Sequence, residues 1–312
     1  MDIVTSHNGM RAILELDDDE IKWWRKKIGD VRGRYVLAPK DLIVNYINSV
    51  KDDPDYTNRV NNASDFIREV RDKTWATYIE SELLFYKTVV RELLEEREHP
   101  HDVLSSVITE ETILDFNRSE NHAELLLKIS DVFGNFAGRI FPYFFELSKS
   151  VTNSRRSRAG KAFEQIIHSI MEAYRYPYDD QSRLGKRTFE QKGLGKMVDG
   201  ILPGMSAYDT NRSKCLVVTM KTTLRERWQE VVEELNRTNV PSIHLLTLDE
   251  GINTNLLDLM RNHNITLVTY KETKERFSAE YTNIISFETL FNTEIPHTIE
   301  WWRRTYPDDY PR

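Results

Sequence analysis

Two apolar runs decide the fold class of this chain: MVDGIL at residues 197–202 and CLVVTMK at residues 215–221. Both runs are short and are bounded by Gly, Pro, Asn and Ser, a composition typical of β-strands. The second run has five non-polar residues among its first six, which predicts a strand buried inside a sheet. It ends in Lys221, and a lysine beside a core is unusual unless its flexible stem carries the charge to the surface.

The segments after these runs alternate between helix and strand. Apolar residues at helical spacing predict helices over residues 158–174, 224–237 and 254–263. Further apolar runs predict strands over residues 243–248 and 265–270. This order predicts an α/β (α+β) fold, with a mixed central sheet flanked by helices.

Residues 1–150 are predicted to form a separate, mostly helical region that precedes a second region over residues 151–312. Helices are expected over residues 17–29, 41–50 and 75–97, and from residue 119 until Pro142 interrupts the pattern. Within 75–97, apolar residues recur at spacings of four, three, four and three, and they predict a buried face: Ile79, Leu83, Tyr86, Val90 and Leu93.

The formal net charge of −7 over 312 residues argues at first against a nucleic-acid partner, but the basic residues are clustered. One cluster lies within seven residues that contain no acid: Arg155, Arg156, Arg158 and Lys161. A second group follows: Arg183, Lys186, Arg187, Lys192 and Lys196. The first cluster is a candidate for contacts with a DNA backbone, and the alternative is a solvated charged face.

The single cysteine, Cys215, excludes an internal disulfide framework and fits a reducing compartment. Residues 1–9 lack the basic and apolar segments of a signal peptide, and no stretch approaches the ~18 apolar residues of a membrane helix. We therefore expect a soluble, cytoplasmic protein with no membrane partner.

Asp199 and Lys221 are the residues with the chemistry for cutting a phosphodiester. Neighbouring strands can bring them together, so that the carboxylate holds Mg²⁺ and the ammonium orients water and stabilises developing charge. A single carboxylate is a poor Mg²⁺ site. Further acids are available on the next predicted helix and on the helix before the strands: Glu230, Glu233, Glu234 and Glu164. Each glutamate could instead belong to a solvated helix surface.

Five segments resemble the CCGG family of type II restriction endonucleases, which belongs to the PD-(D/E)XK superfamily, and especially the enzymes that cut CCNGG or CCWGG. They are RSRAGKAFE (156–164), VDG (198–200), VTMKTT (218–223), RERW (225–228) and HLLTLDEG (244–251). The resemblance implies a homodimer that makes Mg²⁺-dependent double-strand cuts in DNA at a short palindrome, before the first C.

The resemblance also implies roles for individual residues. The superfamily usually has an acid two residues before the lysine, where this chain has Thr219. In the resembling family the second metal-binding acid has moved to the next helix, which matches Glu234, and Glu164 has an accessory role. Arg225, Glu226 and Arg227 would read the C·G pairs, because Arg donates to guanine and Glu accepts from cytosine; a surface salt-bridge trio is the alternative.

In the CCNGG-type enzymes the central bases are flipped out of the helix. Trp75, with Arg71 one turn earlier, resembles the pair that holds an extruded base, although Trp75 could also be a core residue. A companion DNA methyltransferase acting on the same site, without direct binding, should protect the host genome. Two alternatives stay open: a structure-specific or repair nuclease of the same fold, and a non-catalytic DNA-binding protein.

Overall fold

The computed structural model describes residues 2–5, 11–194, 198–224, 229, 231–233, 240–277 and 279–307. The chain divides into two units, and each unit is built from two separate stretches. The first unit comprises Met1–Ala38 and Ala76–Ser157, and the second comprises Pro39–Trp75 and Arg158–Arg312. The predicted boundary after residue 150 differs from this division in two ways: the observed boundary in α8 (Phe141–Ala173) falls after Ser157, and residues 39–75 belong to the second unit.

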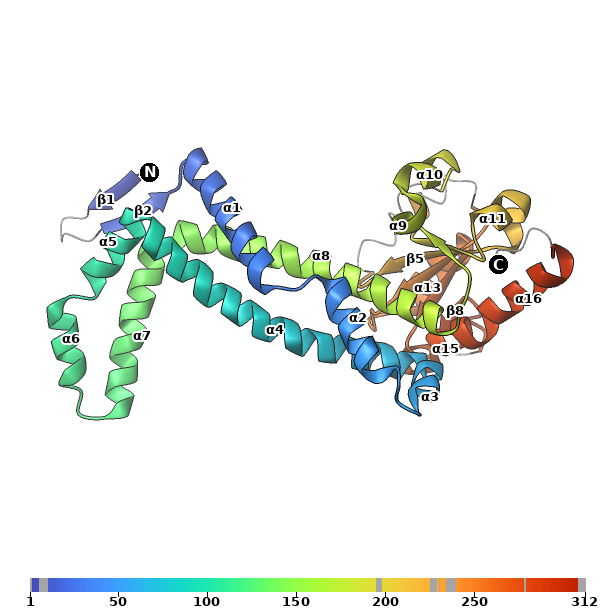
Figure 1. Cartoon of the computed structure of the whole chain (residues 1–312), viewed down its shortest axis with the longest axis horizontal. Coiled ribbons are helices and arrows are strands. Elements are labelled where there is room, and N and C mark those ends of the chain that lie inside the picture. The colour runs from blue at the N-terminus through green and yellow to red at the C-terminus, as the bar shows by residue number, and fades with distance from the viewer. Residues whose placement is uncertain are drawn as a thin grey trace. The chain divides into compact units, whose positions relative to one another are not determined.

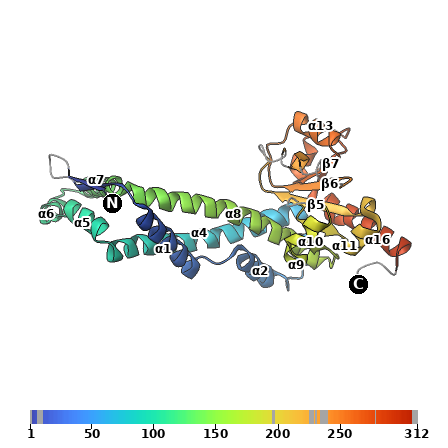
Figure 2. The same cartoon turned by 90° about the horizontal axis from the view of Figure 1, so that it is seen from above.

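The second unit contains a mixed six-stranded sheet, as predicted, in the order β3-β4-β5-β6-β7-β8. Strands β3 to β5 pair antiparallel, whereas β5 to β8 pair parallel. Figure 2 shows β6 between β5 and β7. The strands are Asp179–Asp180 (β3), Gly200–Leu202 (β4), Leu216–Lys221 (β5), Ile243–Thr247 (β6), Ile265–Thr269 (β7) and Ile284–Ser286 (β8). All five residues of β6 are buried, as expected for a parallel strand covered on both faces.

Helices from both stretches of chain surround this sheet. The first stretch contributes α2 (Pro39–Val50), α3 (Tyr56–Asn61) and residues 63–75 of α4 (Ala63–Glu96), and the second contributes residues 158–173 of α8. The remaining helices are α9 (Gln181–Leu184), α10 (Lys186–Gln191), α11 (Met205–Asn211), η1 (Arg212–Lys214), α13 (Thr254–Asn262), α14 (Lys271–Glu275), α15 (Phe287–Thr289), η2 (Leu290–Glu294) and α16 (Ile295–Thr305). Of the predicted helix over 224–237, Leu224, residue 229 and residues 231–233 are described; Leu224 is not helical, and the other four residues are.

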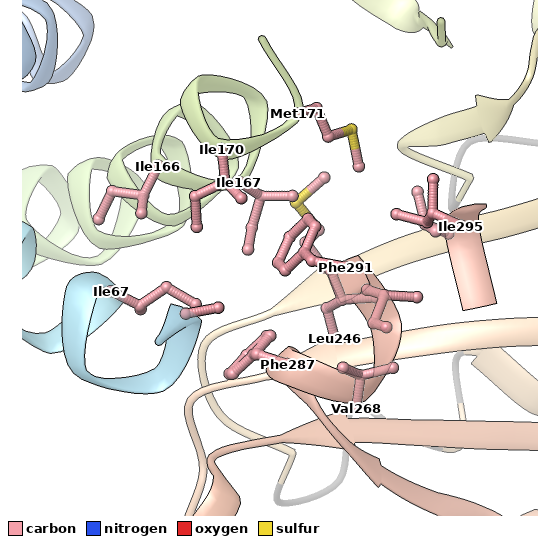
Figure 3. Close-up of a cluster of buried hydrophobic side chains, with 14 of the residues drawn as sticks. Ile67, Ile166, Ile167, Ile170, Met171, Leu246, Val268, Phe287, Phe291 and Ile295 are labelled. Atoms are coloured by element: carbon pink, nitrogen blue, oxygen red, sulfur yellow. The ribbon is translucent and has the colours of Figure 1, made fainter. Parts of the chain in front are cut away.

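Alternate strand residues pack on opposite faces of the sheet. Leu246 and Val268 lie on the face covered by Ile67 of α4 and by Ile166, Ile167 and Ile170 of α8 (Figure 3). Leu245 and Leu267 lie on the other face, in a cluster with Leu257 and Met260 of α13. Trp302 of α16 joins that second cluster, and its Nε1 donates to the Lys214 carbonyl at 2.8 Å. The C-terminal helix therefore packs against the sheet.

The first unit is mostly helical, as predicted, but it also contains a two-stranded antiparallel ribbon that the sequence pattern did not reveal. Its elements are β1 (Asp2–Thr5), β2 (Arg11–Glu15), α1 (Asp18–Tyr35), residues 76–96 of α4, α5 (Glu98–Val107), α6 (Glu110–Asn117), α7 (His122–Arg139) and residues 141–157 of α8 (Figure 1). No described helix combines the length and the apolar composition that a bilayer crossing requires.

The predicted buried face of residues 75–97 is wrong in part. Leu93 is buried, and Tyr86 and Val90 are half-buried and pack against the core of the unit, but Leu83 is 65% exposed. The buried face of this half of α4 is instead shifted by one residue, because Tyr78, Glu82, Phe85 and Val89 are the buried residues. The apolar periodicity predicted the wrong face because a glutamate, Glu82, occupies a buried position.

Glu82 is buried in the first unit because a cation neutralises it. The Arg155 guanidinium forms an ion pair with Glu82, with Nε 3.1 Å from Oε1, and the Tyr78 hydroxyl donates to the same carboxylate. This hydrogen bonding raises the pKa of Arg155. A buried carboxylate without such partners would cost several kcal/mol, about 3–5 when one partner of a buried pair is removed.

Candidate active site

Asp199 directly precedes β4 and is held against β5 by both its backbone and its side chain. Its N–H donates to the Val218 carbonyl at 2.9 Å, which extends the antiparallel pairing of the two strands. Its Oδ2 accepts from the Met220 N–H at 2.6 Å and from the Thr219 hydroxyl at 3.2 Å. The carboxylate is therefore fixed at the strand end, as the sequence predicted for a site residue.

Lys221 and Glu164 lie within electrostatic reach of Asp199. Burial raises the pKa of Asp199, and the Lys221 ammonium acts in the opposite direction. Burial also raises the pKa of Glu164, the Asp199 carboxylate raises it further, and Lys221 lowers it. Three of the predicted catalytic residues, from two strands and the α8 helix, thus form one electrostatically coupled group.

The raised pKa of Asp199 predicts that the metal-free protein becomes more stable when this charge is removed. Between the ordinary pKa of 3.8 and the raised value, the native state binds more protons than the unfolded state, so stability falls as pH rises through this window. Asp199→Asn should therefore raise the unfolding midpoint in EDTA at neutral pH by on the order of a few degrees. The difference should shrink as the pH falls towards 3.8.

Thermal unfolding of both proteins across this pH range checks the expectation. Asp209→Asn is the matched control, because Asp209 is an exposed acid paired with Lys192 and should gain no stability from losing its charge. A lower midpoint for Asp199→Asn at neutral pH would show that ionised Asp199 does not destabilise the fold.

The donor chemistry of this group fits a hard divalent cation. Mg²⁺ prefers oxygen ligands and is usually held by one or two carboxylates together with substrate phosphates and water. Asp199 and Glu164 are two carboxylates whose ionised forms are disfavoured by burial, and a cation would favour those forms. Within the described stretches, no three or more His, Cys, Asp or Glu residues come together as a metal-binding group.

Several predicted site residues lie outside the described part of the chain. These are the metal-ligand candidates Glu230 and Glu234, the recognition triplet Arg225, Glu226 and Arg227, and Lys196. Glu233 is described and is exposed. The residue before the triplet, Leu224, is buried, and its N–H donates to Asp249 Oδ2 at 2.8 Å.

Arg71 and Trp75, the predicted pair for a flipped base, lie four residues apart on α4 and so share one face. Arg71 Nη1 donates to the Tyr270 hydroxyl at 3.3 Å. Trp75 is 46% exposed, so its ring is not simply part of the core. Both residues belong to the second unit, which also contains the coupled acids.

The basic residues that were predicted to contact the DNA backbone are divided between the two units. Arg155 belongs to the first unit and pairs with buried Glu82, so a phosphate would have to compete with that carboxylate for it. Arg158 and Lys161 belong to the second unit, and Lys161 acts on the pKa of Glu164. The side chains of Arg156 and Lys161 are exposed.

The structure adds two positioning residues that the sequence pattern missed. Gln181 Nε2 donates to the Val198 carbonyl, next to Asp199, at 2.7 Å. Asp249 holds the Leu224 N–H through Oδ2 and the Gly251 N–H through Oδ1, at 2.8 and 2.9 Å. The available signals for Asp249 were its place two residues after the buried strand β6 and inside the segment HLLTLDEG (244–251).

Comparison with known protein families and known proteins identifies relatives of this chain. A family model described as the EcoRII C terminal matches residues 128–291. The chain is 30% identical over 249 residues to the type II restriction enzyme SsoII of Shigella sonnei, covering 80% of this chain and 73% of that protein. It is 27% identical over 200 residues to the type II restriction enzyme EcoRII of Escherichia coli, covering 60% and 46%.

Solved structures agree with these sequence matches. Metal-depleted Ecl18kI in complex with uncleaved DNA superimposes with a TM-score of 0.68 and 27% identity, over 92% of this chain and 88% of that chain. The restriction endonuclease PspGI in complex with substrate DNA superimposes with a TM-score of 0.54 and 18% identity, over 85% and 94%, and supports the fold alone.

Proposed function

Because this chain belongs to the EcoRII C-terminal family of type II restriction endonucleases, and so is a site-specific deoxyribonuclease, we propose that it cuts double-stranded DNA at a CCNGG-type palindrome. The observation that carries this proposal is the placement of Asp199, just before β4, within electrostatic reach of Lys221 at the end of β5 and of Glu164 on α8. The cut falls before the first C and leaves 5′ overhangs, as in the enzymes that the sequence resembles.

Mg²⁺ is the proposed cofactor, with Asp199 and Glu234 as its ligands and Glu164 in an accessory role. When bound, the ion lowers the pKa of water and polarises the scissile phosphate. Lys221 orients the attacking water and stabilises the negative charge that develops on the phosphate. Thr219 and the Met220 N–H hold Asp199 in place for this role.

Arg225, Glu226 and Arg227 are the proposed readers of the CC and GG base pairs. Two bidentate arginine contacts to guanine and one glutamate contact to cytosine suit adjacent G·C pairs in the major groove. The anchoring of Leu224 by Asp249 supports this role, because it fixes the backbone immediately before the triplet. Arg155, Arg156, Arg158 and Lys161 are the proposed backbone contacts.

The central bases of the site are proposed to flip out of the duplex against Trp75, with Arg71 beside it. Flipping costs a few kcal/mol of stacking, which an aromatic platform offsets. The 46% exposure of the Trp75 side chain supports this role, since a ring in the core could not receive a base.

The active form is proposed to be a homodimer, in which each protomer reads one half of the palindrome. The α6–α7 hairpin supports this proposal (Figure 1). Six large apolar side chains on it are between 45% and 68% exposed: Ile113, Leu114, Leu126, Leu127, Ile129 and Phe133. Exposed large apolar side chains gathered on one hairpin are typical of a protein–protein interaction site.

Two further proposals concern the enzyme that protects the host DNA and the location of this protein in the cell. A DNA methyltransferase that modifies the same site would protect the host genome without binding this protein. A cytoplasmic location fits both activities, because the substrate DNA and the modification enzyme are there.

Digestion of unmethylated plasmid DNA with the purified protein and Mg²⁺, followed by sequencing of the fragment ends, tests the proposed function. Discrete fragments whose ends share a CCNGG-type site are expected. A smear of random ends would favour a structure-specific or repair nuclease, and site-specific binding without cleavage would favour a non-catalytic DNA-binding protein. Omission of Mg²⁺ is the internal control and should abolish the cuts.

A further inference from the structure

Thr219 carries a hydroxyl that is completely buried in the middle of the sheet. The residue belongs to β5, and its side chain is 0% exposed. On this strand Val217, Thr219 and Lys221 point to the same face, because strand side chains alternate. Burying a hydroxyl without a hydrogen-bond partner is unfavourable, so the partner of the Thr219 hydroxyl indicates what this side chain does.

That partner is the carboxylate of Asp199. The Thr219 hydroxyl donates to Asp199 Oδ2 at 3.2 Å, and the Met220 N–H donates to the same oxygen at 2.6 Å. Among the described residues, Oδ1 of Asp199 has no hydrogen-bond partner. The two donors therefore fix the plane of the carboxylate through one oxygen and leave the other free to act as a ligand.

We propose that Thr219 is a positioning residue that directs Asp199 Oδ1 towards the divalent cation. The inference rests on the proposed metal-binding role of Asp199. At this position the superfamily usually has a second acid, and here a hydroxyl orients the remaining acid instead. A side chain that acts on a metal ligand in this way typically changes metal affinity about 10–100-fold when it is lost.

The test compares three variants by titrating Ca²⁺ into the protein–DNA complex in a calorimeter. Thr219→Val keeps the shape and removes the hydroxyl, so its Ca²⁺ affinity should fall about 10–100-fold, whereas Thr219→Ser should stay within about threefold of wild type. Thr269→Val is the matched control. Thr269 is equally buried, on β7, and within the described part of the chain its hydroxyl has no partner, so Ca²⁺ affinity should not change.

Cleavage kinetics give the second readout. The Mg²⁺ concentration for half-maximal rate should rise in Thr219→Val, while the KM for DNA stays the same. Wild-type Ca²⁺ affinity in Thr219→Val, an equal loss in Thr219→Ser, or the same loss in Thr269→Val would each overturn the inference. If Ca²⁺ binding to the wild type is not reduced by Asp199→Ala, the proposed metal site itself is wrong. Unfolding midpoints of all variants identify any that fail to fold.

Discussion

Replacing Asp199 with alanine is expected to lower the cleavage rate at saturating Mg²⁺ by at least about 1000-fold. The variant loses a carboxylate that lies at the junction of β4 and β5 and interacts with both Lys221 and Glu164. Lys221→Ala should lower the rate by about 100–1000-fold, because it removes charge stabilisation while leaving the carboxylates in place. Single-turnover cleavage of supercoiled plasmid measures both effects.

The matched control is Asp209→Ala, which removes an exposed acid of the same unit. It should cleave at the wild-type rate. Binding of DNA in the absence of metal should survive in Asp199→Ala, because removing a negative charge does not weaken contacts with phosphates. If Asp199→Ala cleaved within about tenfold of the wild-type rate, the catalytic group would have to be sought elsewhere.

Introducing charges on the α6–α7 hairpin is expected to dissociate the proposed homodimer. Leu126, Ile129 and Phe133 lie at helical spacings of three and four on α7 and therefore share one face. In the double variant Ile129→Glu/Phe133→Glu, two carboxylates would have to be buried in the interface, which should weaken self-association at least about 100-fold. Double-strand cleavage should fall with it, since one protomer reads half a palindrome.

Sedimentation velocity at matched concentrations measures the oligomeric state, and plasmid digestion measures the loss of double-strand cuts. Leu259→Glu is the control, because Leu259 is 41% exposed on α13 of the other unit and should tolerate the charge. An intact dimer in the double variant would place the interface on another surface. A monomeric, fully active wild type would exclude the homodimer altogether.

The strand pattern was sufficient to predict the central sheet and the Asp199–Lys221 pair. Buried parallel strands require continuous apolar runs, so β5, β6 and β7 were visible as such, and a charge at the end of a run stood out. The short strands β3 and β8, with two and three residues, carry too little pattern to be recognised. The coupling of Glu164 to the pair was expected from resemblance and not from spacing.

The sequence pattern could not predict side-chain hydrogen bonds or the packing of residues that are far apart in the chain. Glu82 occupies a core position only because Arg155, 73 residues later, neutralises it. Residues 39–75 read as part of the N-terminal region, yet the Ser64 N–H and hydroxyl bond to the Glu288 carboxylate, 224 residues away. No local periodicity encodes contacts of this sequence separation. The predicted roles of Arg225, Glu226, Arg227 and Glu234 remain predictions, because these residues lie outside the described part of the chain.

The assembly of the second unit from two stretches of chain limits how this nuclease can be shortened or transplanted. Ile43, Val60, Phe66, Ile67 and Val70 all come from the earlier stretch and pack in the core cluster that covers the sheet. A fragment beginning after residue 150 would expose that apolar surface to water and should aggregate. Engineered fusions that use this cleavage activity therefore need residues 39–75 as well as the sheet, although the proposed catalytic residues all lie after residue 158.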